Sequence, residues 1–130
     1  MKRTVLIALA TAVVLAACAA LEEKERRPRE TNVTVDEKQA YLVVDQEPII
    51  VRGQDVTIVW RIATSGYEFP PDGVVFRDAR DQFISCAPKG NIFQCLDRNT
   101  EKGRFKYTIK VRPTGTARAP HPLDPTVMND

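Results

Sequence analysis

Residues 104–112 read RFKYTIKVR, and this stretch decides the class of the fold. Apolar residues occupy every second position from Phe105 to Val111, and the positions between them carry basic residues or threonine. Successive side chains of a strand point to opposite faces, so this period of two predicts a strand with one buried face. An apolar stripe with this spacing cannot lie on one face of a helix.

A second segment repeats the pattern. Residues 56–63 read VTIVWRIA, with apolar side chains at alternate positions from Val56 to Ile62. Turn dipeptides such as Asp72-Gly73 and Lys102-Gly103 separate shorter apolar runs. These runs are further predicted strands, at 32–35, 40–44, 49–51, 74–77, 82–86 and 92–96. Short strands at this spacing indicate an all-β domain over 31–112, a small antiparallel β-sandwich.

This layout resembles immunoglobulin-like and cupredoxin-like sandwiches. The resemblance is carried by Trp60 on a central strand and by segment 103–107, in which a glycine precedes alternating aromatic residues. Copper-binding cupredoxins need two histidines, a cysteine and usually a methionine. Here the single histidine, His121, and Met128 both follow the predicted strands. We therefore expect the fold without a metal site, and no cofactor.

The N-terminus has the pattern of an export signal. Lys2 and Arg3 precede an uncharged, mostly apolar run at 4–17. Its 14 residues are too few for a transmembrane helix, which needs about 20, but are typical of a signal peptide. We expect residues 1–17 to be a signal peptide.

The run ends in Leu15-Ala16-Ala17-Cys18, which resembles the lipobox of bacterial lipoproteins. The resemblance implies cleavage before Cys18, a diacylglycerol on its thiol and an acyl chain on its new amine. An ordinary signal peptide with an incidental cysteine is the alternative. Ala19 stands where an aspartate would favour retention in the inner membrane. The resemblance thus implies a protein anchored to the outer membrane and facing the periplasm.

Two segments of biased composition flank the predicted domain. Residues 18–30 contain the lipidated cysteine and a charged linker, with a short helix possible over 21–27. Residues 113–130 contain four prolines, which predicts a disordered tail. An extended strap or a partner-binding peptide is the alternative for this tail.

Cys86 and Cys95 are expected to form a disulfide. An exported domain is in an oxidising compartment, and the two cysteines flank a turn at 88–91. With Cys18 lipidated, the remaining cysteines form an even pair. A redox or metal pair is the alternative, but the CxxC spacing and further ligands are absent from the sequence.

Two surfaces are candidates for binding. The loop at 65–73 carries Tyr67 and Phe69 beside two prolines, and a stiff loop presents aromatic side chains at low entropic cost. Alternatively, both rings pack onto the core. A basic face could meet lipid headgroups or a glycan, or could be the solvated side of a strand. Its residues are Arg104, Lys106, Lys110 and Arg112.

The sequence offers little for catalysis. Ser65 and Ser85 are the only serines, and the predicted domain contains no histidine to activate them. The aspartates Asp72, Asp78 and Asp81 lie near glycine and arginine, which is typical of turns. We therefore expect that the protein is not an enzyme.

Net charge argues against nucleic acid as the partner. The formal charge is +2, and without Lys2 and Arg3 the chain has 17 basic and 17 acidic side chains. The leading hypothesis is therefore a lipid-anchored envelope protein that binds another envelope protein or a glycan, or has a structural role. An inhibitor of a cell-wall hydrolase and an assembly factor of a secretion or outer-membrane machine are the alternatives.

Overall fold

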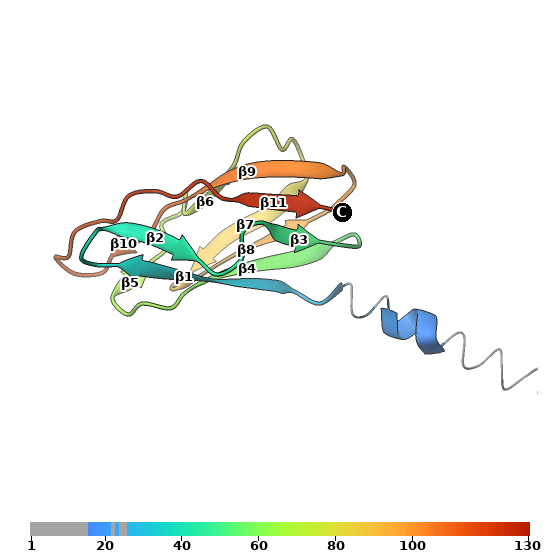
Figure 1. Cartoon of the computed structure of the whole chain (residues 1–130), viewed down its shortest axis with the longest axis horizontal. Helices are drawn as coiled ribbons and strands as arrows, with labels where there is room; N and C mark the ends of the chain where they lie inside the picture. Colours follow the sequence, from blue (N-terminus) through green and yellow to red (C-terminus); the bar gives the residue numbers. More distant parts are fainter. Residues whose placement is uncertain (1–15, 22, 24–25) are drawn as a thin grey trace, which may run out of the picture.

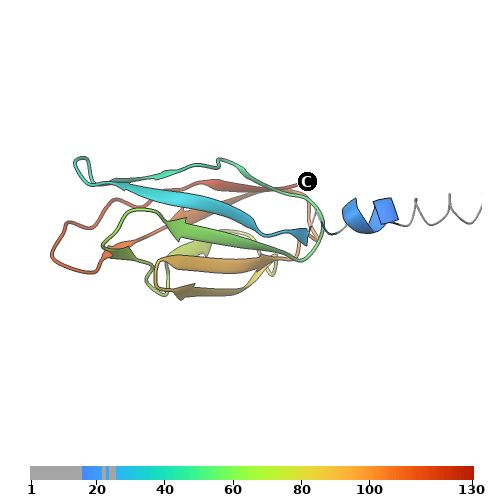
Figure 2. The ribbon, with the colours of Figure 1, turned by 90° about the horizontal axis from the view of Figure 1, so that it is seen from below.

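The computed structural model describes residues 16–21, 23 and 26–130. All long strands run along one axis, and the described helical residues 16–21, 23 and 26 lie beyond one end of the domain (Figures 1 and 2). Residues 1–15, where most of the signal peptide is expected, lie outside the described residues. Within the described part, no helix is long and apolar enough to cross a membrane.

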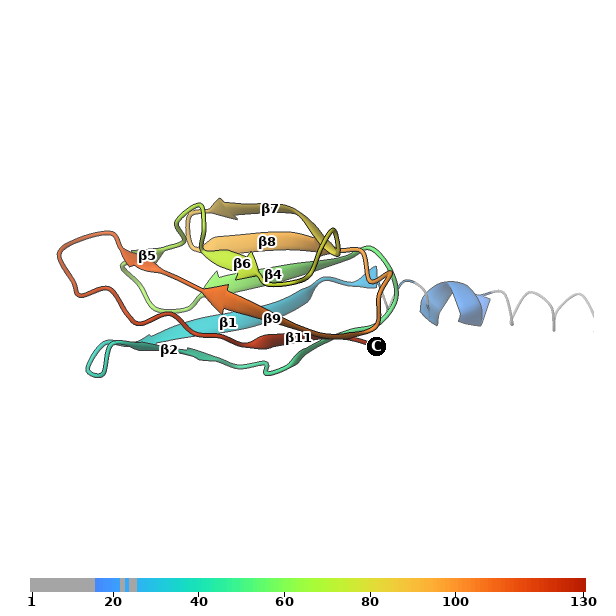
Figure 3. The same cartoon turned by 90° about the horizontal axis from the view of Figure 1, so that it is seen from above.

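Two sheets pack face to face, which confirms the predicted all-β sandwich. The first has the order β2 (Tyr41–Val44), β1 (Arg29–Asp36), β4 (Val56–Ile62), β8 (Ile92–Asp97) and β7 (Phe83–Lys89). The second has the order β3 (Ile49–Val51), β11 (Thr126–Asn129), β9 (Gly103–Ile109) and β6 (Val74–Phe76). Figure 3 looks down on the second sheet, which covers the first. A short ladder joins β5 (Tyr67–Glu68) to β10 (Arg112–Pro113).

The strands predicted from two-residue periodicity are confirmed. Strand β4 alternates buried and half-buried residues from Val56 to Ile62, and β9 buries Phe105, Tyr107 and Ile109. Their apolar faces meet between the sheets, where the indole of Trp60 is fully buried. Its ring makes edge contacts with the rings of Phe76, Phe93 and Tyr107. This aromatic cluster fills the centre of the core.

The sheets are mixed, which corrects the prediction of an antiparallel sandwich. Strand β1 pairs with β4 in parallel, and β11 pairs with β3 in parallel. The alternation of side chains that identified the strands is the same in parallel and antiparallel sheets, so it does not predict strand direction. Parallel pairs also need long connections, and residues 52–125 separate β3 from β11.

The C-terminal segment is folded, so the prediction of a disordered tail over 113–130 was wrong. Strand β11 lies inside the second sheet, hydrogen-bonded to β3 and β9, and Val127 is fully buried. The prolines of the segment precede this strand, so none removes a donor from its ladder. The prediction used the composition of the whole segment, which is dominated by its prolines, and so missed the short strand Thr126–Asn129 at its end.

The N-terminal boundary of the domain also differs from the predicted residue 31. Strand β1 begins at Arg29 and pairs in register from Arg29↔Ile58 to Val33↔Ile62. Arg29 is half-buried and Glu30 is exposed at the start of the strand. Both are charged, so their composition is the same as that of the predicted linker. Helical residues precede the strand, and they include residues 16–20, which lie outside the predicted range 21–27.

Candidate functional site

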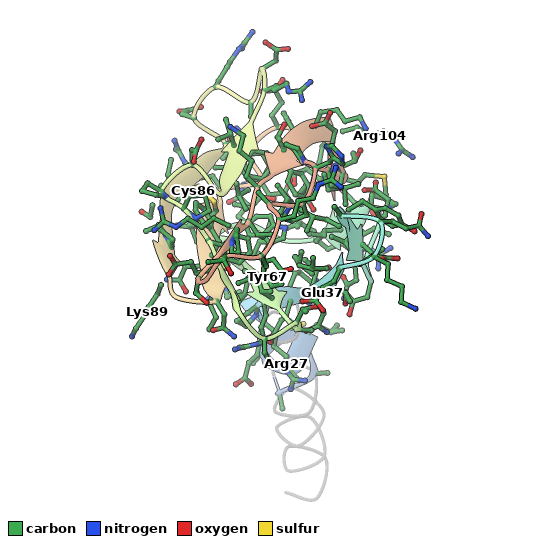
Figure 4. All side chains as sticks on the ribbon, turned by 90° about the vertical axis from the view of Figure 1, so that its left-hand side faces the viewer. Arg27, Glu37, Tyr67, Cys86, Lys89 and Arg104 are labelled. Carbon is green, nitrogen blue, oxygen red and sulfur yellow. A yellow bond between two sulfur atoms is a disulfide. The ribbon has the colours of Figure 1, made fainter. Side chains whose placement is uncertain are left out.

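The end of the sandwich opposite the N-terminal helix is formed by loops (Figure 1). Strand β1 starts at the helix side and runs away from it, and the parallel strand β4 ends at the same far end. We call this far end the distal end. It consists of the turns 37–40 and 90–91 and the loops 63–66 and 114–120. Figure 4 looks onto it.

Backbone hydrogen bonds tie the two distal loops together. Thr114 N–H donates to the carbonyl of Gly66 at 2.9 Å, and the Thr114 hydroxyl donates to the same oxygen at 3.2 Å. The β5–β10 ladder continues this contact, and Arg112 pairs with Glu68 at 2.8 Å across it. The loops therefore hold one another in place at their bases.

The turns of the distal end are tied into the same network. Phe69 N–H donates to the carbonyl of Gly90 at 3.0 Å, and His121 N–H donates to the carbonyl of Ala40 at 2.8 Å. The Tyr67 hydroxyl donates to Glu37 Oε1 at 3.3 Å, and the two side chains lie side by side in Figure 4. Burial and then the charge of Glu37 raise the pKa of Tyr67. Each distal loop or turn is thus bonded to another part of the same end.

The prediction that Tyr67 and Phe69 form a binding surface was wrong. Tyr67 is 6% exposed and Phe69 is 3% exposed. The Phe69 ring packs against the ring of Phe93, with centroids 5.7 Å apart. The alternative, that both rings pack onto the core, is the one observed. The two aromatic side chains, two positions apart, point to the core face and close the distal end of the sandwich.

The exposed part of the distal end is instead made of small residues. Ser65 and Gly66 are exposed, and so is every residue from Thr114 to Ala119. This segment reads TGTARA, so it presents mainly backbone and short side chains, with Arg118 as its one charged group. Sequence reasoning missed it because the surrounding prolines suggested disorder. In fact Pro113 lies in β10 and Pro120 is buried, so the two prolines fix the ends of the loop.

Half of the predicted basic face is paired with carboxylates. Lys110 Nζ lies 3.0 Å from Asp72 Oδ2, and Arg112 is paired with Glu68. Hydrogen bonding and charge from Lys110 lower the pKa of Asp72. Neighbouring segments supply these carboxylates, as expected for the solvated side of a strand.

The other half of the basic face lies toward the helix side. Lys106 Nζ donates to the carbonyl of Asp124 at 2.9 Å, while the guanidinium of Arg104, whose backbone pairs with β11, makes no hydrogen bond or ion pair with the described residues. Both line a surface depression of about 450 Å³, together with basic and acidic neighbours. The remaining lining includes Arg77, Asp78, Glu101 and Lys102. The lining thus has four basic and two acidic side chains, so it keeps a positive excess.

The predicted disulfide is present. Cys86 and Cys95 form a disulfide between the adjacent strands β7 and β8, with Cα atoms 4.1 Å apart. Cys18 is a free, exposed cysteine in the N-terminal helix. The disulfide joins the buried Cys95 to an exposed, bulged position of the edge strand.

The remaining polar candidates lie in separate places. Asp81 pairs with Arg98 at 2.9 Å, whereas Asp78 is exposed. Ser85 lies on edge strand β7, and His121 bridges to Tyr41 at the opposite edge of that sheet. Over residues 16–21, 23 and 26–130, no three His, Cys, Asp or Glu side chains form a group that could hold a metal ion.

Comparisons with known proteins give no family. No protein-family model matches the sequence, and no curated protein matches it. Among solved structures, the chain is similar to the cysteine protease inhibitor EhICP2 from Entamoeba histolytica, with 13% identity and a TM-score of 0.42. The likeness covers 78% of this chain and 94% of that chain. A likeness of this strength does not indicate a function.

Proposed function

We propose that this protein is a lipid-anchored, non-enzymatic binding module of the cell envelope, and that its distal end contacts a macromolecular partner. One observation carries the proposal: the exposed loops opposite the N-terminal helix are fixed by hydrogen bonds at their bases. A loop that is ordered before binding loses little conformational entropy when a partner docks. Loops on a rigid scaffold are also where binding residues are concentrated in proteins generally.

The anchor in this proposal is Cys18. It is exposed and lies on the helix side of the domain, so an attached lipid would not disturb the fold. Two or more acyl chains give stable attachment, because each buried methylene contributes about 0.8 kcal/mol. Strand β1 then leads from the membrane side to the distal end, which places the loops away from the lipid surface.

Fractionation of cells tests the anchor. Cys18→Ser is expected to move the protein from membranes to the soluble fraction, whereas Cys86→Ser, at the exposed end of the disulfide, is expected to stay membrane-bound. Ala19→Asp is expected to shift the protein from the outer to the inner membrane. Membrane retention of the Cys18→Ser variant would refute lipid anchoring.

Site-specific photocrosslinking tests the distal end. A photoreactive residue at Thr116, in the exposed loop, is expected to give a discrete adduct in cells. The matched control is Gln94, which is exposed on the outer face of β8. Equal adducts from both positions, or none from Thr116, would contradict binding through the distal end.

A hydrolase inhibitor is the second candidate function. The observation that favours it is loop 114–119, which is fully exposed along its length while its base is held by Gly66. Inhibitors of enzymes generally bind with little backbone change, so a fixed exposed loop suits that role. Inhibition assays with lysozyme and with a cysteine protease, at micromolar protein, distinguish it from an assembly factor. An assembly factor would inhibit neither enzyme and would crosslink to a component of a secretion or outer-membrane machine.

A further inference from the structure

Among the described residues, three buried side-chain oxygen atoms without hydrogen-bond partners belong to residues that are hydrogen-bonded to one another at the helix side of the domain. They are Asp97 Oδ2, Asn99 Oδ1 and Asn129 Oδ1. The three residues are at most 3% exposed. Buried polar atoms in proteins are almost always paired, so three acceptors without a donor in one cluster require a chemical explanation.

The hydrogen bonds of the cluster fix which atoms are left over. Asp97 Oδ1 accepts from the backbone N–H of Asn99 at 2.9 Å and from Asn129 Nδ2 at 3.2 Å. Asn129 Nδ2 also donates to the carbonyl of Glu101 at 3.2 Å. Turning this amide over would place its oxygen against two other acceptors. The oxygen of Asn129 is therefore the end that lacks a donor.

Asn99 is held in the same way. Its Nδ2 donates to the carbonyl of Gly53 at 2.8 Å and to that of Val51 at 3.3 Å. The cluster thus joins the end of β8, the end of β3 and strand β11 through bonds from side chains to backbone groups and one bond between side chains. All these donors are directed at other acceptors, so among the described residues none is bonded to the three remaining oxygens.

The surroundings of Asp97 offer little charge to stabilise a carboxylate. In the ladders, Asp97 lies opposite Val56 on β4 and Phe83 on β7. Lys102 is the cation that acts on it, and Lys102 Nζ itself donates to the Asp130 carbonyl. The other nearby charges are paired at the surface: Arg98 with Asp81, and Arg52 with the Asp130 carboxylate. Burial raises the pKa of Asp97 to about 6, against the opposing effects of its two hydrogen bonds and Lys102.

We propose that a proton taken from solvent onto Asp97 Oδ2 supplies the missing donor and locks strand β11 onto the domain in mildly acidic medium. In this proposal the carboxyl hydroxyl donates to the unpartnered oxygen of Asn99 or of Asn129, the two residues that are already hydrogen-bonded to Asp97 Oδ1. Protonation also removes the buried negative charge. Because Asn129 belongs to β11, the bonds of the cluster hold the second sheet closed at this end.

The direction of the pH dependence follows from the two states of Asp97. Its ordinary pKa is 3.8 and its pKa in the folded protein is about 6, so the folded state binds more protons between these values. The folded state is therefore favoured as the pH falls, and the gain is lost as the pH rises through 6. From pH 7.5 to pH 5 the equilibrium constant for unfolding is expected to fall about tenfold.

Urea unfolding of the full chain in a mild non-ionic detergent at pH 7.5, 6 and 5 tests the proposal. Asp97→Asn carries a neutral amide donor, so it is expected to abolish the tenfold change and to unfold at pH 7.5 with a smaller equilibrium constant than the parent. The control is Asp78→Asn, an exposed aspartate at a positive φ of 52° that asparagine also adopts. The control is expected to keep the pH dependence of the parent.

A second measurement does not depend on the variant folding. The ¹³C shift of the Asp97 side-chain carboxyl in the parent protein is expected to titrate near pH 6. Amide protection factors of β11 are expected to rise about tenfold from pH 7.5 to pH 5. Titration of Asp97 below pH 4.5, or an unchanged pH dependence in Asp97→Asn, would overturn the proposal. Stabilisation of the parent by 1 mM Ca²⁺ that disappears in Asp97→Asn would also overturn it, because the cluster would then hold a cation.

Discussion

The indole nitrogen of Trp60 donates a hydrogen bond of 3.1 Å to the hydroxyl oxygen of Tyr107. Trp60 lies on β4 in the middle of the first sheet, and Tyr107 lies on β9 in the second. Both side chains are fully buried, and their ring centroids are 5.4 Å apart. This polar contact therefore joins the two layers inside an aromatic cluster at the centre of the core.

Removing the Tyr107 hydroxyl tests this contact. Tyr107→Phe leaves the buried N–H of Trp60 without an acceptor, and an unsatisfied buried donor costs about 1–3 kcal/mol. Urea unfolding is expected to show a loss of that size. Tyr41→Phe, at a tyrosine that is 39% exposed, is the matched control and is expected to change stability by less than about 0.5 kcal/mol. Equal effects of the two substitutions would argue against the contact.

Two glycines provide a second matched pair. A Cβ on Gly73 would lie 2.8 Å from Phe69 Cδ1 and 3.0 Å from the Pro70 carbonyl, whereas a Cβ on Gly115 would have no atom within 4 Å. Gly73→Ala is expected to destabilise by about 1–3 kcal/mol through overpacking against the buried Phe69 ring. Gly115→Ala is expected to be neutral, or to stabilise by up to about 1 kcal/mol. Thermal melting of both variants decides the point, and a neutral Gly73→Ala would contradict the packing described.

The disulfide gives a third prediction. It closes the loop 86–95, and a loop of this length is expected to contribute about 2.5–3 kcal/mol through restriction of the unfolded chain. Reduction should therefore lower the urea midpoint of the parent protein. Cys18→Ser, outside the strands, is expected to leave the midpoint unchanged under oxidising conditions. A midpoint that does not respond to reducing agent would show that the pair is dispensable for stability.

The last strand gives a fourth prediction. Ending the chain after Pro125 removes β11 and leaves β3 and β9 with unpaired backbone on facing edges, so cooperative unfolding is expected to disappear. Arg118→Ala alters the exposed loop of the same segment and is expected to leave the transition intact. Circular dichroism during urea titration is the measurement. Cooperative unfolding of the shortened chain would mean that β11 is not required for the fold.

Local pattern was sufficient to predict most strands. The alternation from Phe105 to Val111 and from Val56 to Ile62 identified the two strands that carry Tyr107 and Trp60. The hairpin that brings Cys86 to Cys95 was also predictable, because a turn separates the cysteines by a short distance along the chain. These features depend on residues that are close in the sequence, and a two-residue period or a turn dipeptide is a local signal of this kind.

Features that depend on distant residues were not predictable in this way. Strand β11 has only four residues, and its place between β3 and β9 depends on partners far away in the sequence. The burial of Tyr67 depends on Glu37, and that of Phe69 on Phe93. Aromatic residues beside prolines are compatible with either an exposed loop or the end of a core. Composition alone does not distinguish these outcomes, because burial is decided by tertiary contacts.

The position of β11 also governs the order in which the molecule can be completed. Residues 126–129 are made after every other strand, yet they occupy an interior place in the second sheet. During synthesis or export, β3 and β9 emerge before β11, so the backbone groups that pair with β11 are at first unpaired. Closure of the sandwich is therefore expected only after residues 126–129 have emerged. Until then, the unpaired edges of β3 and β9 must be protected from pairing with strands of other chains.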